Sequence, residues 1–570
     1  MTHRDNGYVA LPPDDHHESG SSGCAMESTL VTNGTFTIHP GSSSEYSYAY
    51  GPGGFEGLKH NYYTLLSAIL ASIGGLLFGY DQGVIANVLV MEDFKLRWAM
   101  TDWQEGVMTA MLELGALVGA LLAGALADRY PRRTSIFTAC VVFIIGSLFQ
   151  CGAQSIRDLI IGRTIGGLGI GSLSMLSPLY LAEISPPEVR GSLMALEQLA
   201  IVLGVVLGFW TGFYTRDYEG STSWRVPLAI QIIPAIILAF GCLFLPPSPR
   251  LLIIEGKNEE ALSALARLRL RKPEEEYSDP LLKIEYLEMQ VEAELIRRSE
   301  VRILGIDGDS KNEFKKEIHG WMKLFQPKFR DRVLIGAAMM FFQQWSGINA
   351  LIYYGPHLME RIGLQGDTPE LLGSGGVGII QLLAVVPAVL YIDRLGRKPL
   401  LQWGGLVMCG AHAAVGLLVL RYQSDWASHH VAAWMAVGCV YIFTAAYGFS
   451  YGPIAWILPS EILPLSIRSR GAAIATASVW MNNFIIGLIT PVLLSASPAN
   501  TFFIFSIACF AAVIWSRQCV PETAGVSLEE IGMLLGSGTE REEEDLRREI
   551  ASEVGLERLI SELSSGAHYD

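Results

Sequence analysis

The stretch GGLLFGYDQGVIAN, from Gly74 to Asn87, decides how this chain must fold. It lies in a run from Tyr62 to Val90 that is almost wholly apolar, small or aromatic. Such a run is long enough for the ~20-residue helix that crosses a hydrocarbon core. Asp81 stands inside it, and an ionisable group within the bilayer is costly enough to be functional by default. The stretch therefore predicts a membrane-spanning helix that carries a functional ionisable residue.

The composition of the whole chain agrees with a membrane protein. Of its 570 residues, 50% are hydrophobic and 17% are charged, which is too apolar for a soluble protein of this size. The net charge of −15 offers no basic face for nucleic acid. The eight cysteines are scattered without a CxxC pair, and the sequence has no Walker A, HExxH or GxSxG motif. We therefore expect no nucleic-acid partner, no cofactor, no metal, no catalytic residue and no ATP-driven step.

Twelve apolar stretches are predicted to be membrane-spanning helices. They begin near residues 62, 103, 133, 158, 191 and 224, and then near 332, 369, 398, 431, 467 and 500. The predicted fold is an all-α membrane protein with 12 helices in two six-helix bundles, residues 61–245 and residues 332–518.

Three further segments complete the organisation. Residues 1–60 are rich in Gly, Ser and Pro and are predicted to be a disordered tail. Residues 246–331 form a linker with two amphipathic helices, 259–276 and 281–300. Residues 519–570 form an acidic tail, in which 542–563 is either a docking helix or a solvated acidic helix.

The two sets of six spans resemble each other in their loops. GALADRYPRR follows the second span and YIDRLGRK the eighth, while PPSPR closes the sixth and VPET the twelfth. After the fourth and tenth spans a Glu precedes an Arg by seven residues, as Glu183 and Arg190, then Glu461 and Arg468. Ordered recurrence of three motifs predicts a duplicated unit, which is typical of transporters whose substrate site lies between the halves at mid-membrane.

The distribution of Lys and Arg predicts the orientation in the membrane. The loops after spans 2, 4, 8 and 10 hold nine of these residues, and the loops on the opposite side hold about six. Because Lys and Arg accumulate on the cytoplasmic side, both termini and the linker are expected in the cytosol.

Asp81 has a predicted partner in Arg163, which stands in GRTIGGLGIG of the fourth span. Counted at 1.5 Å per residue, the two groups lie ~12 Å and ~8 Å from the same membrane face. Protonation of Asp81 would free Arg163 at little charge cost, which suits a proton-coupled carrier. The alternative is a permanent ion pair that moves no proton. Gly162, Gly166, Gly167 and Gly171 have the spacing of closely packed helices.

The seventh span, FFQQWSGINALIYYG, predicts a binding site for a neutral ligand with many hydroxyls. Amides donate and accept hydrogen bonds, and aromatic rings cover C–H faces. Each residue alone is better explained by bonding between helices, but the set predicts a cavity, with a helix break in GPIAW at residues 452–456. The polar and aromatic residues concerned are Gln343, Gln344, Asn349, Tyr353 and Tyr354, with Gln198, Trp456, Trp480 and Asn483 in other spans.

Together these motifs resemble the sugar porters of the major facilitator superfamily, in their fungal-type branch, over residues 62–523. The resemblance implies two six-helix bundles that rock about a central site, with Asp81 and Arg163 as the proton-coupling pair. The sugar contacts that it implies are Gln198, Gln343, Gln344, Asn349, Tyr353 and Trp456, with Phe78 and Trp480 lining the pocket and Gln381 where members commonly carry Asn.

The same resemblance implies a cytosolic gate of salt bridges that locks the outward-open state and breaks on inward opening. Its residues here are Asp128, Arg129, Arg133, Glu183, Arg190, Asp393, Arg394, Arg397, Glu461 and Arg468. Two departures affect the pocket, Gln381 and the apolar Val479 before Trp480. Pro247 stands in PPSPR where the family usually has Glu, so one ion pair of the gate is expected to be missing.

The sequence thus predicts a monosaccharide:proton symporter that acts as a monomer in the plasma membrane. Its partners would be a neutral sugar, protons and the lipid bilayer. One alternative is a proton-coupled polyol or glycerol carrier, because amide sites accept any polyol. The other is a non-transporting sugar sensor that signals through its cytosolic tails.

Overall fold

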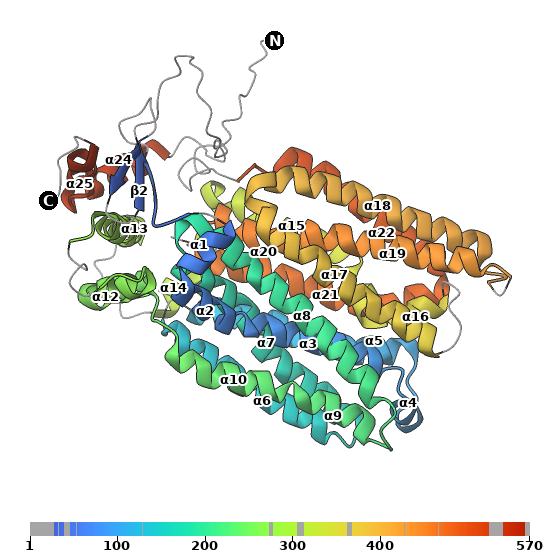
Figure 1. Ribbon diagram of the computed structural model, residues 1–570. Helices are drawn as coiled ribbons and strands as arrows, with labels where there is room; N and C mark the ends of the chain where they lie inside the picture. The colour runs from blue at the N-terminus through green and yellow to red at the C-terminus, as the bar shows by residue number, and fades with distance from the viewer. Residues whose placement is uncertain are drawn as a thin grey trace, which may run out of the picture.

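The computed structural model describes residues 28–31, 34–38, 46–52, 54–127, 129–272, 278–304, 313–361, 367–426, 428–464, 467–523 and 540–564. Most of these residues are helical, and the helices run side by side in one elongated body (Figure 1).

The first six spans form one bundle, coloured blue to green in Figure 1. Span 1 is α2 (Tyr62–Ala71) continued by α3 (Ile73–Val88), and the short α4 (Glu92–Arg97) links it to span 2, which is α5 (Asp102–Leu126). The remaining spans are α6 (Arg132–Gly152), α7 (Ile156–Ile184), α8 (Arg190–Thr215), and α9 (Thr222–Ile230) continued by α10 (Ile232–Gly241).

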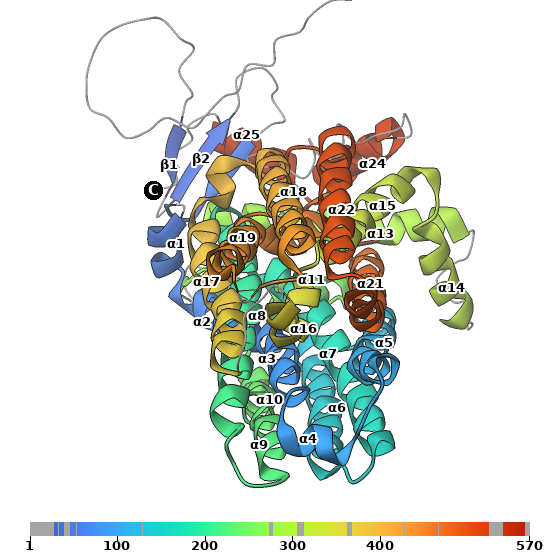
Figure 2. The same cartoon turned by 90° about the vertical axis from the view of Figure 1, so that its right-hand side faces the viewer.

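The last six spans form the second bundle. They are α15 (Pro327–Trp345) continued by α16 (Ile348–Arg361), α17 (Asp367–Leu395), α18 (Arg397–Tyr422), α19 (His430–Phe449) continued by α20 (Tyr451–Ile462), α21 (Arg468–Ala496) and α22 (Pro498–Cys519). Figure 2 shows the two bundles one above the other, and they meet where α5 packs on α21 and α8 on α17.

The predicted twelve-span architecture is confirmed, with one span built differently from the rest. Within the described ranges, eleven spans are long and apolar enough to cross a membrane as they stand. The twelfth is the pair α15 and α16, which is broken at Ser346 and Gly347. Gly347 has φ +92°, a conformation that L side chains rarely adopt, and a Cβ there would lie 2.7 Å from the Phe505 ring.

A second break separates α19 from α20 at Ser450, whose φ and ψ are −127° and −86°. The break expected within residues 452–456 is therefore misplaced, because this segment lies inside α20. Pro453 is the third residue of α20, where a missing N–H costs no helical hydrogen bond.

Glycines let neighbouring helices approach to backbone contact. A Cβ on Gly171 of α7 would lie 1.9 Å from the carbonyl oxygen of Ala116 on α5, and one on Gly79 of α3 would lie 1.8 Å from that of Ile201 on α8. The predicted close packing along Gly162, Gly166, Gly167 and Gly171 is confirmed.

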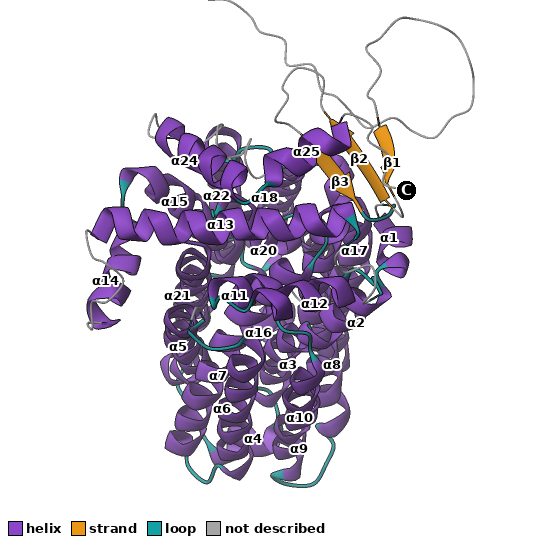
Figure 3. Cartoon of the chain, turned by 90° about the vertical axis from the view of Figure 1, so that its left-hand side faces the viewer, coloured by secondary structure: helices purple, strands orange, loops and turns teal. Residues whose placement is uncertain are grey.

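One end of the bundles, called here the linker end, carries the segment between them (Figure 3). The linker holds α11 (Pro249–Ile254), α12 (Asn258–Leu268), α13 (Pro280–Leu304) and α14 (Glu313–Lys323). Two helices were predicted here. The second is confirmed as α13, and the first is confirmed as α12 but ends at Leu268, earlier than predicted. The opposite end, where α4 lies, is called the α4 end (Figure 1).

The prediction of disorder throughout residues 1–60 is wrong. The strands β1 (Ser28–Val31), β2 (Gly34–Ile38) and β3 (Tyr46–Ala49) form an antiparallel sheet in the order β1-β2-β3, followed by α1 (Gly54–His60). Phe36 and Tyr50 are buried against Leu281, Ile284 and Val291 of α13. Local composition did not reveal this sheet, because its apolar partner lies more than 200 residues further along the chain.

The acidic tail forms two helices, α24 (Glu540–Glu553) and α25 (Leu556–Ser564), which pack on α13. Ile550 and Leu559 are buried in the same apolar cluster as Phe36. Of the two alternatives for this segment, docking is therefore observed, and the docking surface belongs to the chain itself. We call the sheet, α13, α24 and α25 the tail domain.

A buried carboxylate joins the tail domain to the membrane helices. Glu285 of α13 accepts hydrogen bonds from Arg269 Nε (2.9 Å) and Nη2 (2.5 Å) and from the Tyr50 hydroxyl (2.8 Å). Arg269 also donates to the carbonyl oxygen of Ile184 at the end of α7 (3.0 Å). Burial alone would raise the pKa of Glu285, but the Arg269 charge and the hydrogen bonds from Arg269 and Tyr50 hold it below its ordinary value.

We predict that Glu285→Gln loosens the tail domain by about 3 kcal/mol, because it breaks a buried, multiply bonded ion pair. Limited proteolysis of the purified chain should cut the tail domain faster than in the wild type. The wild-type contribution is present above the unfolded pKa of Glu, ~4.3, and is lost as the pH falls through the lowered folded pKa. Glu285→Gln should lack this acid dependence.

The control is Glu294→Gln, which removes a surface ion pair with Arg297 and Arg298 from the same helix. Surface pairs contribute ~1 kcal/mol or less. Equal proteolysis rates for the two variants would contradict the role of Glu285.

Candidate functional site

The Asp81 and Arg163 side chains lie together in the first bundle, at the depth that counting residues suggested. Arg163 Nη1 is 3.4 Å from Asp81 Oδ2, and the side chains are 1% and 0% exposed. Arg163 Nη2 donates to the carbonyl oxygen of Thr109 on α5 (3.1 Å). Neither oxygen of Asp81 accepts a hydrogen bond. The pair is thus held by charge alone, so a proton can reach Asp81 without first breaking a hydrogen bond.

A second buried carboxyl group, Glu113, faces this pair and was missed by the sequence analysis. It lies on α5 one turn after Thr109 and is 0% exposed. Its charge interacts with those of Arg163 and Asp81, and its carboxyl faces the hydroxyl of Tyr353. The signal was present in the sequence, since MLELGALVG places an ionisable residue inside the second span.

Next to the pair lies a small cavity between the two bundles. Gln82, which follows Asp81 in the sequence, lines this cavity from α3. The polar and aromatic lining residues are Phe78, Gln82, Gln198, Gln343, Gln344, Asn349, Gln381, Tyr447 and Trp456, and the apolar ones are Ile201, Val205, Ile348 and Ile352.

The amides of this cavity are arranged around the break between α15 and α16. Asn349 Nδ2 donates to Gln344 Oε1, and Gln344 Nε2 donates to Gln343 Oε1 (3.3 Å). Gln343 Nε2 donates to the carbonyl oxygen of Gly452 (3.3 Å). Gln381 Oε1 is buried without a protein donor. A buried acceptor of this kind is costly unless a donor reaches it, and a ligand hydroxyl is such a donor.

Three of the residues predicted to contact substrate do not line this cavity: Tyr353, Trp480 and Asn483. The hydroxyl of Tyr353 accepts hydrogen bonds from Gln82 Nε2 (2.6 Å) and Asn483 Nδ2 (2.8 Å). Trp480 donates to Ser174 Oγ (2.9 Å) and packs edge-on against Phe78, with ring centroids 4.7 Å apart. These residues form the layer behind the wall, because position along a span does not fix the direction in which a side chain points.

Two polar lining residues were missed by the sequence analysis, Gln82 and Tyr447. Gln82 directly follows Asp81, so its position in the span was a usable signal. We find no comparable signal for Tyr447.

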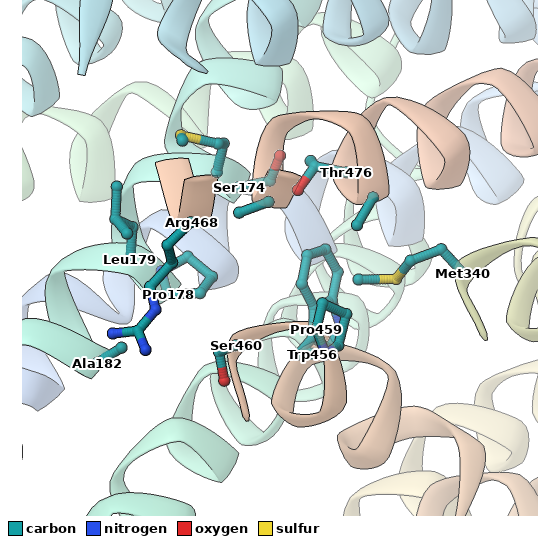
Figure 4. A pocket seen from close by; sticks show the side chains of 13 residues that line it. Ser174, Pro178, Leu179, Ala182, Met340, Trp456, Pro459, Ser460, Arg468 and Thr476 are labelled. Atoms are coloured by element: carbon teal, nitrogen blue, oxygen red, sulfur yellow. The ribbon is translucent and has the colours of Figure 1, made fainter. Parts of the chain in front are cut away.

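Figure 4 shows a second cavity, to which the start of α21 at the linker end contributes. Its residues come from α7, α15, α20 and α21, and Arg468 reaches into it from the start of α21. Trp456 lines both cavities and therefore stands between them.

At the linker end, two equivalent ion pairs reflect the internal repeat. Arg132 Nη2 is 2.7 Å from Glu183 Oε1, and Arg397 Nη2 is 2.7 Å from Glu461 Oε1. Each arginine also donates to a backbone carbonyl five residues earlier, at Ala127 or Ile392. The partner of Glu183 is therefore Arg132, which was not among the predicted gate residues. Superposing PRR on GRK in the repeated loops would have identified Arg132 as the equivalent of Arg397.

Each of these two ion pairs lies within one bundle and does not cross to the other. The bundles are joined at this end by Ser192 Oγ, which donates to the carbonyl oxygen of Val389 (3.3 Å), and by Arg468, whose charge interacts with that of Glu183. Among the described residues Arg190 has no ion pair, and its Nε has no partner.

Arg129 and Arg133, which were also predicted to belong to the gate, take part in neither of these two ion pairs. Arg129 is exposed and Arg133 half-buried. Asp128 falls outside the described residues, as do the side chains of Asp393 and Arg394.

Comparison with known proteins identifies the family. The profile of the family "Sugar (and other) transporter" matches residues 67–535. The glucose transporter GlcP of Staphylococcus epidermidis is 33% identical over 479 residues, 83% of this chain and 97% of that protein. The galactose-proton symporter of Escherichia coli is 33% identical over 489 residues, 85% and 97% of the two chains.

The solved structures that resemble this one include the proton:xylose symporter XylE, of the major facilitator superfamily, bound to 6-bromo-6-deoxy-D-glucose. Its TM-score is 0.68 at 27% identity, over 83% of this chain and 99% of that chain. For the inward-open conformation of XylE from E. coli the TM-score is 0.61 at 26% identity, with the same coverage. With a family match over most of its length and the same twelve-helix architecture, this chain belongs to the sugar transporter family of the major facilitator superfamily and is an integral membrane protein.

Proposed function

We propose that the chain is a symporter that carries a neutral monosaccharide together with a proton across the plasma membrane. The observation that supports this most is the juxtaposition of two sites on one helix. Asp81 of α3 pairs with Arg163, and Gln82, the next residue, lines the amide cavity. Relatives named as arabinose-proton and galactose-proton symporters support the same conclusion.

The sugar would lie between the bundles. Gln198 reaches it from the first bundle, and Gln344, Asn349 and Gln381 reach it from the second. Amides suit hydroxyls in both directions of hydrogen bonding. Phe78 and Trp456, with ring centroids 6.5 Å apart in an edge-on arrangement, offer apolar faces to the C–H groups of the ring.

Alternating access would move the sugar towards the linker end, which we assign to the cytosol together with both termini. This movement requires the Ser192–Val389 contact to open and Trp456 to leave its place between the two cavities. Protonation of Asp81 would weaken its attraction to Arg163, so that the first bundle rearranges with the proton bound. We assign this cycle to a monomer, since each chain contains both sites. It requires no chemical step of an enzyme.

A proton-coupled polyol carrier is the second candidate. One relative is named probable polyol transporter 3 of Arabidopsis thaliana, 32% identical over 509 residues, and the amide cavity suits an open-chain polyol as well. Uptake of labelled hexoses, pentoses and polyols, with and without an uncoupler, distinguishes the two. A sensor would show no uptake of any of these compounds.

We predict that Asp81→Asn abolishes uphill sugar accumulation but leaves sugar exchange partly intact. The amide keeps the shape of the side chain but binds no proton, so the proton gradient is no longer coupled to transport. The measurement is uptake of labelled sugar into vesicles with an imposed pH gradient. The control is Asp217→Asn in a loop at the α4 end, where the carboxylate is 83% exposed. Accumulation by Asp81→Asn at the wild-type level would refute the coupling role.

We predict that Gln344→Ala weakens sugar binding roughly tenfold or more. The change removes a ligand hydrogen bond and also leaves Asn349 without its acceptor, and such losses cost ~1–3 kcal/mol. The pH dependence of binding should stay as in the wild type, since Asp81 and Arg163 are untouched. Binding to purified protein is the measurement, with the exposed Gln423→Ala as control. An unchanged affinity would exclude Gln344 from the sugar site.

A further inference from the structure

One face of α5 carries polar residues from the α4 end to the Asp81–Arg163 pair. Asp102, Glu105, Thr109 and Glu113 follow one another at spacings of three and four residues, which places them on one side of a helix. Asp102 is exposed and accepts a hydrogen bond from Ser495 Oγ (2.6 Å). Glu105 is partly exposed and lies 3.8 Å from His357 Nδ1. Glu113 is fully buried. We call these four residues the α5 ladder.

The inner end of the ladder holds one positive charge and two carboxyl groups. Arg163, Asp81 and Glu113 are all buried, and their charges interact. If both carboxyls were ionised, the group would carry a net charge of −1 in a medium of low dielectric constant, which costs several kcal/mol. Two carboxyls that share a site do not both stay ionised. Neither oxygen of Asp81 accepts a hydrogen bond, whereas two ionised carboxylates at this depth would need donors.

The other groups around Glu113 connect it to the sugar cavity. Its carboxyl faces the hydroxyl of Tyr353 on α16. That hydroxyl already accepts from Gln82 and Asn483, so its own proton is available to Glu113. The neighbouring Tyr354 donates to the carbonyl oxygen of Gly487 (2.7 Å), and its environment includes Thr109 and Glu105. Gln82 lines the cavity and donates to Tyr353, and Tyr353 faces Glu113. The charge of Glu113 is therefore linked through Tyr353 to an amide of the sugar site.

We infer that Glu113 is a second proton-binding site, which shares one proton with Asp81 across Arg163 and is reached from the α4 end along the α5 ladder. This inference rests on the proposed symport. Hydronium at the α4 end gives its proton to a ladder carboxylate and leaves as water. The proton passes to Glu113 or Asp81 as a carboxyl O–H, and a water on the linker side takes it up when the site opens there.

Glu197 of α8 provides the matched comparison. It is as deeply buried as Glu113, but burial is the only influence on its carboxyl, and no charged group among the described residues acts on it. A buried carboxyl without a charged neighbour has no reason to change its protonation during transport. The two glutamates thus differ in charged neighbours and agree in burial.

The test measures proton uptake when sugar binds to the purified full-length protein. D-glucose is added in weakly buffered detergent solution, and a pH indicator reports the protons bound per sugar. We expect Glu113→Gln to lower this number by about half or more, because one of two linked acceptors is lost. The dependence of sugar affinity on pH should become correspondingly flatter. Glu197→Gln should match the wild type in both measurements.

Glu113→Asp separates a titrating role from a structural one. It keeps a carboxyl one methylene further from Arg163, so proton uptake should persist with a shifted pH midpoint. If Glu113→Gln does not fold, an unshifted midpoint in Glu113→Asp overturns the inference. Wild-type proton uptake and pH dependence in a folded Glu113→Gln overturn it as well. If wild-type protein binds sugar without taking up protons, the symport itself fails. If Asp81→Asn abolishes proton uptake and Glu113→Gln does not lower it, the proposed symport is retained, but Glu113 is excluded as a second proton-binding site.

Discussion

The guanidinium of Arg163 is buried inside the first bundle, and the rest of the transport site has to balance its charge. Arg163 is 1% exposed, and an arginine side chain is not deprotonated in a protein. Its charge therefore has to be balanced by the helices around it, through Asp81 at 3.4 Å on α3 and the Thr109 carbonyl oxygen on α5. Because the positive charge is fixed, only the carboxyl groups can change the net charge of the site. The net charge of this site in the first bundle therefore depends on the number of protons bound to the carboxyl groups.

This arrangement depends on how closely the helices pack. Gly171 brings α7 to backbone contact with α5, and Gly79 brings α3 to backbone contact with α8. A larger residue at either place would meet a carbonyl oxygen well inside contact distance and would push the helices apart. An ion pair of 3.4 Å without hydrogen bonds would not survive such a displacement. The glycines therefore fix the electrostatics of the site as well as the packing.

The sequence predicted what depends on depth along a helix and missed what depends on direction around it or on distant contacts. Asp81 and Arg163 were matched by the constant rise per residue. Tyr353 and Trp480 were placed in the correct spans, but their side chains point behind the cavity wall. Glu113 was passed over although the rule that selected Asp81 applied to it equally. The strands near Phe36 had no local signal, because their apolar partner is α13.

The position of the two sites explains why α16 matters for coupling. Asp81, Arg163 and Glu113 all belong to the first bundle, whereas most of the cavity amides belong to the second. Communication between proton and sugar must therefore cross the interface, and Tyr353 does so by accepting from Gln82 of α3 and Asn483 of α21. Tyr353 lies on α16, which the break at Gly347 separates from α15. Since α16 is not continuous with α15, it can shift over the sugar while α15 keeps its place, and any such shift moves Tyr353 relative to Glu113.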